Sequence, residues 1–254
     1  MNLRRAFTLV ELLVVIAIIA ILAAFLFPVF ITAKGAVHQL GVNRNIGQIS
    51  AANSLYMADY DDTFPIAMYW NYQTGLHTWF GHIEDEQGTV NTKEGFLQPY
   101  MKAKPPKDQA LVAENYLGDD SGIGYNWGVI GSDFHVTGDY TNWPNCQNPA
   151  KGSELDNISR TVVFATSAFY NAKWLPDGDG VKYKFGFFDP PSFWNGVPNV
   201  DYRHMGKTKI DDANQKVLQD GNAIFGFADG NVRTIRMSET KEKFFWRDQS
   251  QFTD

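Results

Sequence analysis

The feature that most constrains this chain is an uncharged apolar run of 20 residues near its N-terminus, from Leu12 to Ile31. A helix of about 20 residues is long enough to cross the hydrocarbon core of a bilayer. Arg4 and Arg5 lie before the run, and basic residues favour the cytoplasmic flank of a membrane span. We therefore expect a single-pass membrane protein with a cytoplasmic N-terminus and an exported C-terminal part.

Glu11 lies at the entrance to the apolar run, where a carboxylate is costly unless it finds a partner. One interpretation is local. Thr8 and Glu11 have the spacing of a capping box, in which Thr8 caps the helix and Glu11 reaches back to an exposed amide. A carboxylate at this place also complements the helix dipole. The local interpretation assigns Glu11 a role within its own chain.

A second interpretation comes from family resemblance. The segment Arg-Ala-Phe-Thr-Leu-Val-Glu, residues 5–11, followed by an apolar helix, resembles the N-terminus of type IV pilins and type II secretion pseudopilins. In that family a prepilin peptidase cuts before the phenylalanine and methylates the new amine. The resemblance implies cleavage between Ala6 and Phe7, which leaves residues 1–6 as a leader; Ala6 replaces the more usual glycine.

The same resemblance implies that residues 7–31 form the membrane and polymerisation helix. Glu11 would pair with the amine of Phe7 in a neighbouring subunit, so that two buried charges set the register between subunits. Pro28 lies where many pilins have a helix proline, and a proline inside a helix removes a hydrogen bond. We expect a bend or a locally melted segment there, although an ordinary transmembrane kink fits the sequence equally well.

Two other readings of the N-terminus compete with this one. An ordinary secretory signal would have its small-residue cleavage site at residues 33–35, Ala-Lys-Gly, but the apolar run is long for such a signal and Glu11 interrupts its start. An uncleaved membrane anchor needs only the apolar run and the basic flank. Except for secretion, each reading places the protein in the bacterial inner membrane with an extracytoplasmic C-terminal domain, and the pilin reading adds a cell-surface filament.

Helical spacing continues beyond the apolar run. Apolar and small residues recur at intervals of mostly three or four, at Val37, Leu40, Ile46, Ile49, Asn53 and Tyr56. An amphipathic continuation over residues 32–58 would make one helix of roughly 75–80 Å. Acidic residues and Pro65 then end the periodicity. We expect the first half of this helix in the membrane or a filament core and the second half on the globular domain.

Residues 59–254 are predicted to form one exported α+β domain with an antiparallel sheet. The chain is 44% hydrophobic and 15% aromatic and has a formal charge of -6, which indicates a folded acidic domain and no nucleic-acid surface. Because Cys146 is the only cysteine, no intrachain disulfide can form. Residues 124–129 and 161–165 are expected to be strands, the second one buried.

The clearest local pattern is a hairpin over residues 223–236, with a two-residue turn at Asp229 and Gly230. This turn would place Phe225, Phe227 and Val232 on one face of the hairpin, and Ile224 and Ile235 on the other.

The end of the chain also resembles the C-terminal part of a large bacterial family of prepilin-type proteins, which carries a His-x9-Asp-Gly signature preceded by arginine. The matching residues are Arg203, His204, Asp229 and Gly230. Here 24 residues separate His204 from Asp229, and residues 205–220 are predicted to be an inserted loop. Asn231 replaces a residue that is often histidine.

The remaining motifs are weak. Asp177 and Asp179 alternate with glycine and could offer oxygens to calcium, but the other ligands of a calcium loop are missing. No metalloprotease, nucleophile-elbow or phosphate-loop motif occurs. We expect no enzyme activity and no cofactor; the expected partners are the membrane, the prepilin peptidase, other subunits and the secretion or pilus machinery.

An alternative function is a membrane-anchored domain that binds glycans and does not polymerise. Trp143, Trp174 and Trp194 lie in loops rich in Asn, Gly and Pro. If these rings were exposed on one face, they could stack on sugars; otherwise most of them belong to the core.

Overall fold

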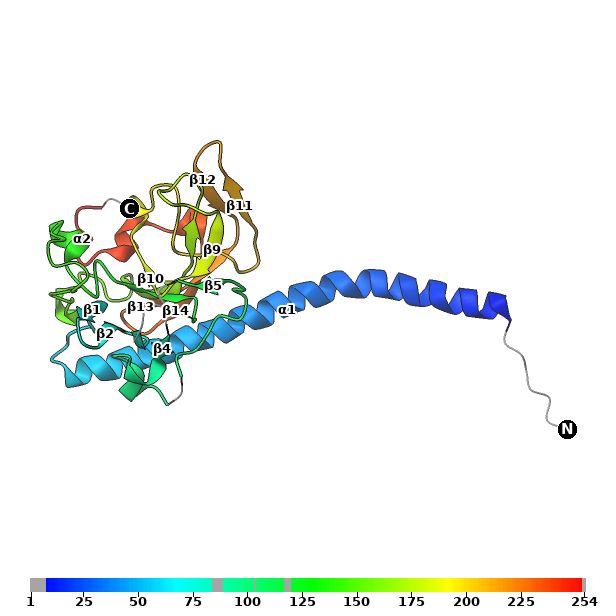
Figure 1. The fold of residues 1–254 in the computed structure, drawn as a ribbon. Coiled ribbons are helices and arrows are strands. Elements are labelled where there is room, and N and C mark those ends of the chain that lie inside the picture. The colour runs from blue at the N-terminus through cyan, green and yellow to red at the C-terminus, as the bar shows by residue number, and fades with distance from the viewer. Residues whose placement is uncertain (1–7, 84–88, 103, 117–119, 253–254) are drawn as a thin grey trace.

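The computed structural model describes residues 8–83, 89–102, 104–116 and 120–252. Its longest element is an unbroken helix, α1 (Leu9–Asp59), of 51 residues. At 1.5 Å per residue this helix is about 76 Å long. Figure 1 shows that the first half of α1 projects freely, while the second half lies along the globular domain. The predicted long helix and the α+β architecture are both confirmed.

One face of the second half of α1 packs on the domain. Its buried residues are Val42, Ile46, Ile49, Ser50, Ala52 and Asn53. Val37 and Leu40, which we predicted on this face, are 67% and 66% exposed. That part of the prediction was wrong because close packing against the domain begins only at Val42, so helical spacing alone did not locate the start of the interface.

Pro28 lies inside α1 without interrupting it. The Thr32 Oγ1 donates a hydrogen bond to the Pro28 carbonyl oxygen at 3.0 Å, and helical structure continues on both sides. Of the two alternatives that we expected, a bend or a locally melted segment, this single chain has no melted segment, and the free half of α1 follows a gentle curve (Figure 1). A proline removes its own amide hydrogen bond and its ring crowds the preceding turn, which bends a helix without ending it where the turns on both sides stay hydrogen-bonded.

Four sheets form the β part of the domain. The central sheet has five strands in the order β10-β6-β7-β13-β14. Only its β10-β6 pair is parallel. Its strands are β10 (Phe187–Phe188), β6 (Ile123–Asn126), β7 (Val162–Thr166), β13 (Asn222–Phe227) and β14 (Val232–Arg236). The predicted buried strand corresponds to β7, all five residues of which are buried.

Three smaller sheets surround the central one. The first is an antiparallel meander of β1 (Met68–Asn71), β2 (Gly75–Thr78), β3 (His82–Ile83) and β4 (Val90–Asn91). The second has the order β5-β9-β8, with β5 (Glu114–Asn115), β9 (Val181–Lys184) and β8 (Phe169–Asn171). The third is the hairpin of β11 (Thr208–Asp211) and β12 (Lys216–Gln219). Residues 205–220, predicted to be an inserted loop, thus contain a two-stranded element.

The remaining elements are short helices. They are α2 (Phe134–Thr137) and the 3-10 turns η1 (Thr92–Glu94), η2 (Gln98–Tyr100), η3 (Gly152–Glu154), η4 (Pro191–Phe193), η5 (Met237–Glu239) and η6 (Glu242–Phe245).

The C-terminal hairpin has a longer turn than we predicted. Its ladder ends at the pair Gly226 and Val232, and the Gly230 amide donates to the Phe227 carbonyl oxygen at 2.9 Å. Gly230 has a φ of +83°, whereas Asp229 is not among the residues with positive φ. Because a two-residue turn of the predicted type needs positive φ at both positions, the register here differs by one residue.

This one-residue difference moves the side chains of β14 to the opposite face. Val232 packs with Ile224 in the core between the sheet and α1. Ile235 packs with Phe225 and Phe227 in the core on the other face. The predicted partners of Val232 and Ile235 were therefore wrong, although the hairpin itself and its burial on both faces are confirmed.

Candidate membrane and assembly site

The start of α1 forms the capping box that Thr8 and Glu11 allow. The Glu11 Oε2 accepts hydrogen bonds from the Thr8 amide at 2.8 Å and from the Thr8 Oγ1 at 2.7 Å. The Glu11 amide donates to the Thr8 Oγ1 at 3.2 Å. Both bonds of a capping box are thus present. Within the part of the chain that the structure describes, the Glu11 Oε1 makes no hydrogen bond, so one carboxylate oxygen is open to a partner outside the chain.

The two residues of the predicted cleavage site, Ala6 and Phe7, lie outside the described residues. Cleavage between them, methylation of the Phe7 amine and its pairing with Glu11 of another subunit therefore stay predictions. Pro28 is described, and it belongs to the freely projecting half of α1.

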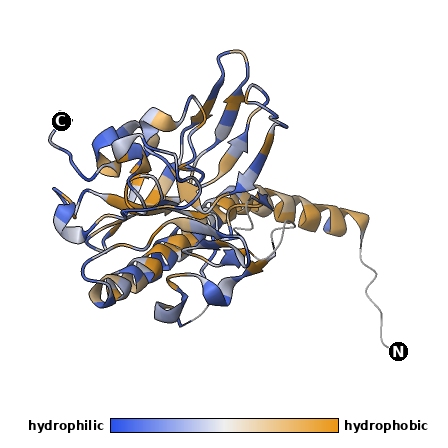
Figure 2. Cartoon of the chain, turned by 60° about the vertical axis from the view of Figure 1, so that its left-hand side comes forward, coloured by the Kyte–Doolittle hydropathy of each residue, from blue (hydrophilic) through white to orange (hydrophobic). Residues whose placement is uncertain are grey.

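The free half of α1 exposes apolar side chains on all sides. Every Leu, Ile, Val and Phe side chain from Leu9 to Ile31 is 45–75% exposed. Figure 2 shows this segment as an almost continuous hydrophobic sleeve outside the domain. By length and composition the helix can cross a membrane. Because soluble monomers rarely expose more than a few hundred Å² of contiguous apolar surface, this sleeve requires a lipid or protein environment.

The sequence of the same segment belongs to a known type. Residues 1–27 match the prokaryotic N-terminal methylation motif. This match, together with the apolar helix, supports a prepilin-type protein that is a substrate of a prepilin peptidase and is anchored in a membrane. No curated protein and no solved structure matches the chain at a significant level.

Arg203 and His204 lie in a buried ion cluster, which also contains Asp108, Asp201 and Lys182. The Arg203 guanidinium contacts the Asp108 Oδ2 at 2.7 Å and the Asp201 Oδ2 at 2.8 Å. The His204 Nε2 lies 3.0 Å from the same oxygen of Asp108, and the Lys182 amine pairs with Asp201. Both carboxylates are fully buried, so this cluster is part of the core.

The charges of the cluster depend on one another. Burial alone would raise the pKa of Asp108, but the Arg203 guanidinium and His204 outweigh it and hold the pKa well below its usual range. Burial likewise opposes ionisation of Asp201, and Arg203 and Lys182 lower its pKa. Both groups are therefore carboxylates at neutral pH.

His204 does not meet the Asp229-Gly230 turn. Its backbone pairs with Asn222, with N–H···O distances of 3.1 and 2.7 Å. Asn222 begins β13, and the turn follows the other end of that strand, about 20 Å away at 3.3 Å per residue. The residues that resemble one C-terminal signature thus lie at opposite ends of the same strand.

The two calcium candidates lie in an exposed turn. The Asp179 side chain accepts hydrogen bonds from the Val181 amide at 2.7 Å and from the Tyr183 hydroxyl at 2.5 Å. The carbonyl oxygen of Asp177 accepts a hydrogen bond from Asn171. Nowhere in the described ranges do three His, Cys, Asp or Glu side chains lie close enough to hold a metal ion.

The three tryptophans proposed for glycan binding lie in different places. Trp174 packs on a small core around Tyr170 and Val217. Trp194 packs on the core behind the central sheet. Trp143 is 52% exposed and contacts Trp127 edge to face. These three rings therefore do not share one binding face.

Trp143 instead belongs to a different group of rings, here called the aromatic cluster, which consists of Trp127, Phe134, His135, Tyr140, Trp143 and Phe193. Sequence reasoning missed this group because, although five of its members lie within residues 127–143, contacts with the distant Asp189 and Phe193 assemble it. The Asp189 carboxylate fixes two of its members, Trp127 and His135, from the buried side of the cluster. The Asp189 Oδ1 accepts from the Trp127 indole at 2.5 Å and lies 2.7 Å from the His135 Nε2.

The side of the aromatic cluster away from Asp189 is exposed to solvent. Tyr140, Trp143 and Phe193 are 40%, 52% and 38% exposed. The Tyr140 hydroxyl lies 2.5 Å from the His135 Nδ1, and partial burial and the Asp189 charge raise the pKa of Tyr140. The tyrosine therefore stays neutral at neutral pH, and its hydroxyl lies beside exposed rings.

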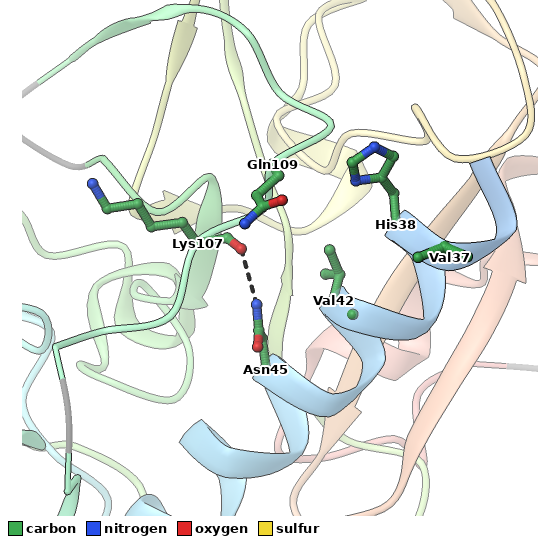
Figure 3. A pocket seen from close by; sticks show the side chains of 7 residues that line it. Val37, His38, Val42, Asn45, Lys107 and Gln109 are labelled. Carbon is green, nitrogen blue, oxygen red and sulfur yellow. Dashed lines mark hydrogen bonds between the residues drawn. The ribbon is translucent and has the colours of Figure 1, made fainter. Parts of the chain in front are cut away.

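A groove runs between α1 and the 107–109 segment (Figure 3). It has a volume of about 270 Å³ and is lined by Val37, His38, Gly41, Val42, Asn45, Lys107 and Gln109. The Asn45 side-chain amide donates to the Lys107 carbonyl oxygen at 2.9 Å, which ties the segment to the helix. The Lys107 amine pairs with Asp120. The groove marks where the domain meets the helix and contains no constellation of catalytic groups.

Proposed function

We propose that this protein is a structural subunit of a type IV pilus or of a type II secretion-type filament. The observation that carries the proposal is the combination of the methylation motif at residues 1–27 with a helix whose first half is apolar and exposed on every side. In the inner membrane of a bacterium, the helix would hold the subunit until assembly. In the filament, the same sleeve would be buried against the helices of other subunits.

The proposed life of the subunit has three steps. The basic leader stays in the cytoplasm, and the prepilin peptidase cuts between Ala6 and Phe7 and methylates the new amine. The domain that follows α1 is outside the cytoplasmic membrane. The assembly machinery then packs the helices, and Glu11 pairs with the Phe7 amine of a neighbour. The resemblance of Arg203, His204, Asp229 and Gly230 to a prepilin-type C-terminal signature supports the same assignment.

Intact mass and N-terminal sequencing of the membrane-extracted protein test the first step. Coexpression with the prepilin peptidase should give a chain that begins at N-methylated Phe7, and omission of the peptidase should give one that begins at Met1. An unprocessed chain in the presence of an active peptidase would contradict the proposal.

Replacing Glu11 by valine tests the assembly step. The variant should still insert and be cleaved, but filament yield should fall sharply, because the Phe7 amine then lacks its partner. Thr8→Val is the matched control, since it removes the local cap, worth about 1 kcal/mol, and keeps the carboxylate. Equal filament yields for the Glu11→Val variant and the wild type would show that Glu11 is only a cap.

A second candidate function, glycan binding by a non-polymerising anchored domain, is supported by the aromatic cluster. Exposed aromatic rings offer apolar faces to sugars, and the Tyr140 hydroxyl beside them offers a polar group. The aromatic cluster lies on the globular domain. Glycan binding there is therefore compatible with a helix that stays in the membrane and with a helix that packs into a filament.

A glycan array probed with the full chain in detergent tests this second candidate. For any glycan that binds, Trp143→Ala should weaken affinity about tenfold, given up to about 1.5 kcal/mol for one aromatic contact. The control is Tyr72→Ala, which removes a ring that is almost fully exposed elsewhere on the domain. Equal losses in the two variants would contradict a site at the aromatic cluster.

A further inference from the structure

The hairpin β11-β12 occupies a distinctive place. It lies on the side of the domain from which the free half of α1 emerges, and β11 lies toward that side (Figure 1). Met205, just before β11, packs against α1, because a Cβ at Gly35 would lie 3.0 Å from the Met205 Sδ. The base of the hairpin is thus fixed to a known position along the helix.

That position corresponds to a depth in the membrane. Gly35 lies four residues beyond Ile31, the last residue of the apolar run, which is about 6 Å along the helix axis. The headgroup layer outside the hydrocarbon core is about 5–8 Å thick. With the span in the bilayer, Met205 and the base of β11 therefore lie at the level of the lipid headgroups.

The exposed side chains of β11 are polar, basic and apolar, a combination that fits the headgroup layer. Thr208, Lys209 and Ile210 are exposed in β11, whereas Val217 in β12 is buried and its amide donates to the Gly196 carbonyl oxygen at 2.9 Å. β11 is thus a free edge strand on an anchored partner. Natural edge strands of this kind are usually covered or protected by charge.

Exposed basic side chains flank Gly35 and Met205 in the sequence and occur at the end of β14. Lys34, Lys207, Lys209 and Arg236 form no ion pair within the described ranges of the chain. Asp220 accepts a hydrogen bond from the Lys207 backbone amide, and Asp211 at the end of β11 accepts hydrogen bonds from Asn214 and interacts only weakly with Lys209. The lysine ammonium groups are therefore available to phosphate oxygens outside the protein, although the whole chain is acidic.

We infer that β11 and Met205 rest on the lipid headgroups of the membrane that α1 spans, with Lys207 and Lys209 at the phosphates and Met205 at the apolar boundary. The inference depends on the anchored topology of the proposed function. Its consequence is a domain held in one orientation on the membrane surface before assembly, in place of a domain free to swing on its helix.

Fluorescence quenching in liposomes of phosphatidylcholine and phosphatidylglycerol tests this contact with the full-length chain. A fluorophore is attached at Ile210→Cys in β11 and, as the matched control, at Tyr72→Cys at the far end of the domain. A third label at Phe25→Cys reports insertion of the helix. Cys146 stays unlabelled, because it is buried and burial raises the pKa of its thiol to about 11.

Nitroxides on the headgroups should quench the Ile210 label far more than the Tyr72 label. Nitroxides on the acyl chains should quench the Phe25 label. Replacing Lys207 and Lys209 by glutamine should lower the equilibrium constant for contact about fivefold per lysine, since each basic residue near an anionic surface contributes about 1 kcal/mol.

Three results would overturn the inference, and each has a different meaning. Equal quenching of the Ile210 and Tyr72 labels, with the Phe25 label quenched by acyl-chain nitroxides, would leave the anchored topology intact and remove the contact. An unquenched Phe25 label would remove the membrane span itself. Shielding of the Ile210 label that rises with protein concentration, without headgroup quenching, would show that a second copy covers β11.

Discussion

Replacing Arg203 by methionine should destabilise the domain by about 3–5 kcal/mol, the usual effect of removing one partner from a buried ion pair. The guanidinium contacts Asp108 and Asp201, both fully buried, and it also donates to the Gly122 carbonyl oxygen at 2.7 Å. Methionine has a similar volume but leaves these oxygens without their main donor. Urea unfolding of the full chain in detergent, followed by tryptophan fluorescence, measures the change.

Arg236→Met is the matched control, because Arg236 is exposed and most surface substitutions change stability by less than about 0.5 kcal/mol. The double variant Arg203→Met with Asp108→Asn should be less destabilised than the sum of the two single changes, since the residues touch. Additive losses would mean that Arg203 and Asp108 do not stabilise the fold as a coupled pair.

The same cluster predicts how stability depends on pH. Because the pKa values of Asp108 and Asp201 are lower in the folded protein than in the unfolded chain, the unfolded chain takes up protons first as the pH falls. The contribution of these carboxylates is fully present above about pH 4 and is lost below it. Without Arg203 burial opposes ionisation, so the loss on acidification should be smaller in Arg203→Met than in the wild type. An identical pH profile for both proteins would contradict the assignment.

Sequence patterns predicted the parts of this fold that repeat along the chain. The apolar run and the helical spacing after it gave the long helix nearly to its ends, because each turn carries its own signal. β7 was recognisable as a run of apolar residues that the structure buries completely. The start of the helix was also readable, since Thr8 and Glu11 interact over three residues.

Features that depend on one residue of turn geometry, or on residues far apart, were not predictable. The hairpin register shifted because its turn is one residue longer than the Asp-Gly dipeptide suggests. Asp108 and Arg203 are 95 positions apart, and their ion pair exists only because the fold brings the loop and the sheet end together. The aromatic cluster depends on the same kind of distant contact, through Asp189 and His135.

Replacing Ile46 by alanine should destabilise the docked half of α1 by about 2–5 kcal/mol, the usual cost of a large-to-small change in a core. Ile46 is fully buried between α1 and the central sheet. Leu40→Ala is the control on the same helix, because Leu40 is 66% exposed and its loss should cost little. Urea unfolding and hydrogen exchange of the amides in residues 42–53 measure the effect, which should leave the free half of α1 in detergent unchanged.

Gly226 in β13 explains why Ile46 fits so closely, and it provides the decisive test. A Cβ at Gly226 would lie 2.7 Å from the Ile46 Cγ2 and 2.9 Å from the Ser50 Oγ, so Gly226→Ala should cost about 1–3 kcal/mol through overpacking. In the Ile46→Ala background the clashing methyl is gone and a space remains. There only the close approach to the Ser50 Oγ remains, so Gly226→Ala should cost clearly less than it does with Ile46 present, a coupling that direct contact produces. Strictly additive losses would mean that α1 is not seated on the sheet at Gly226.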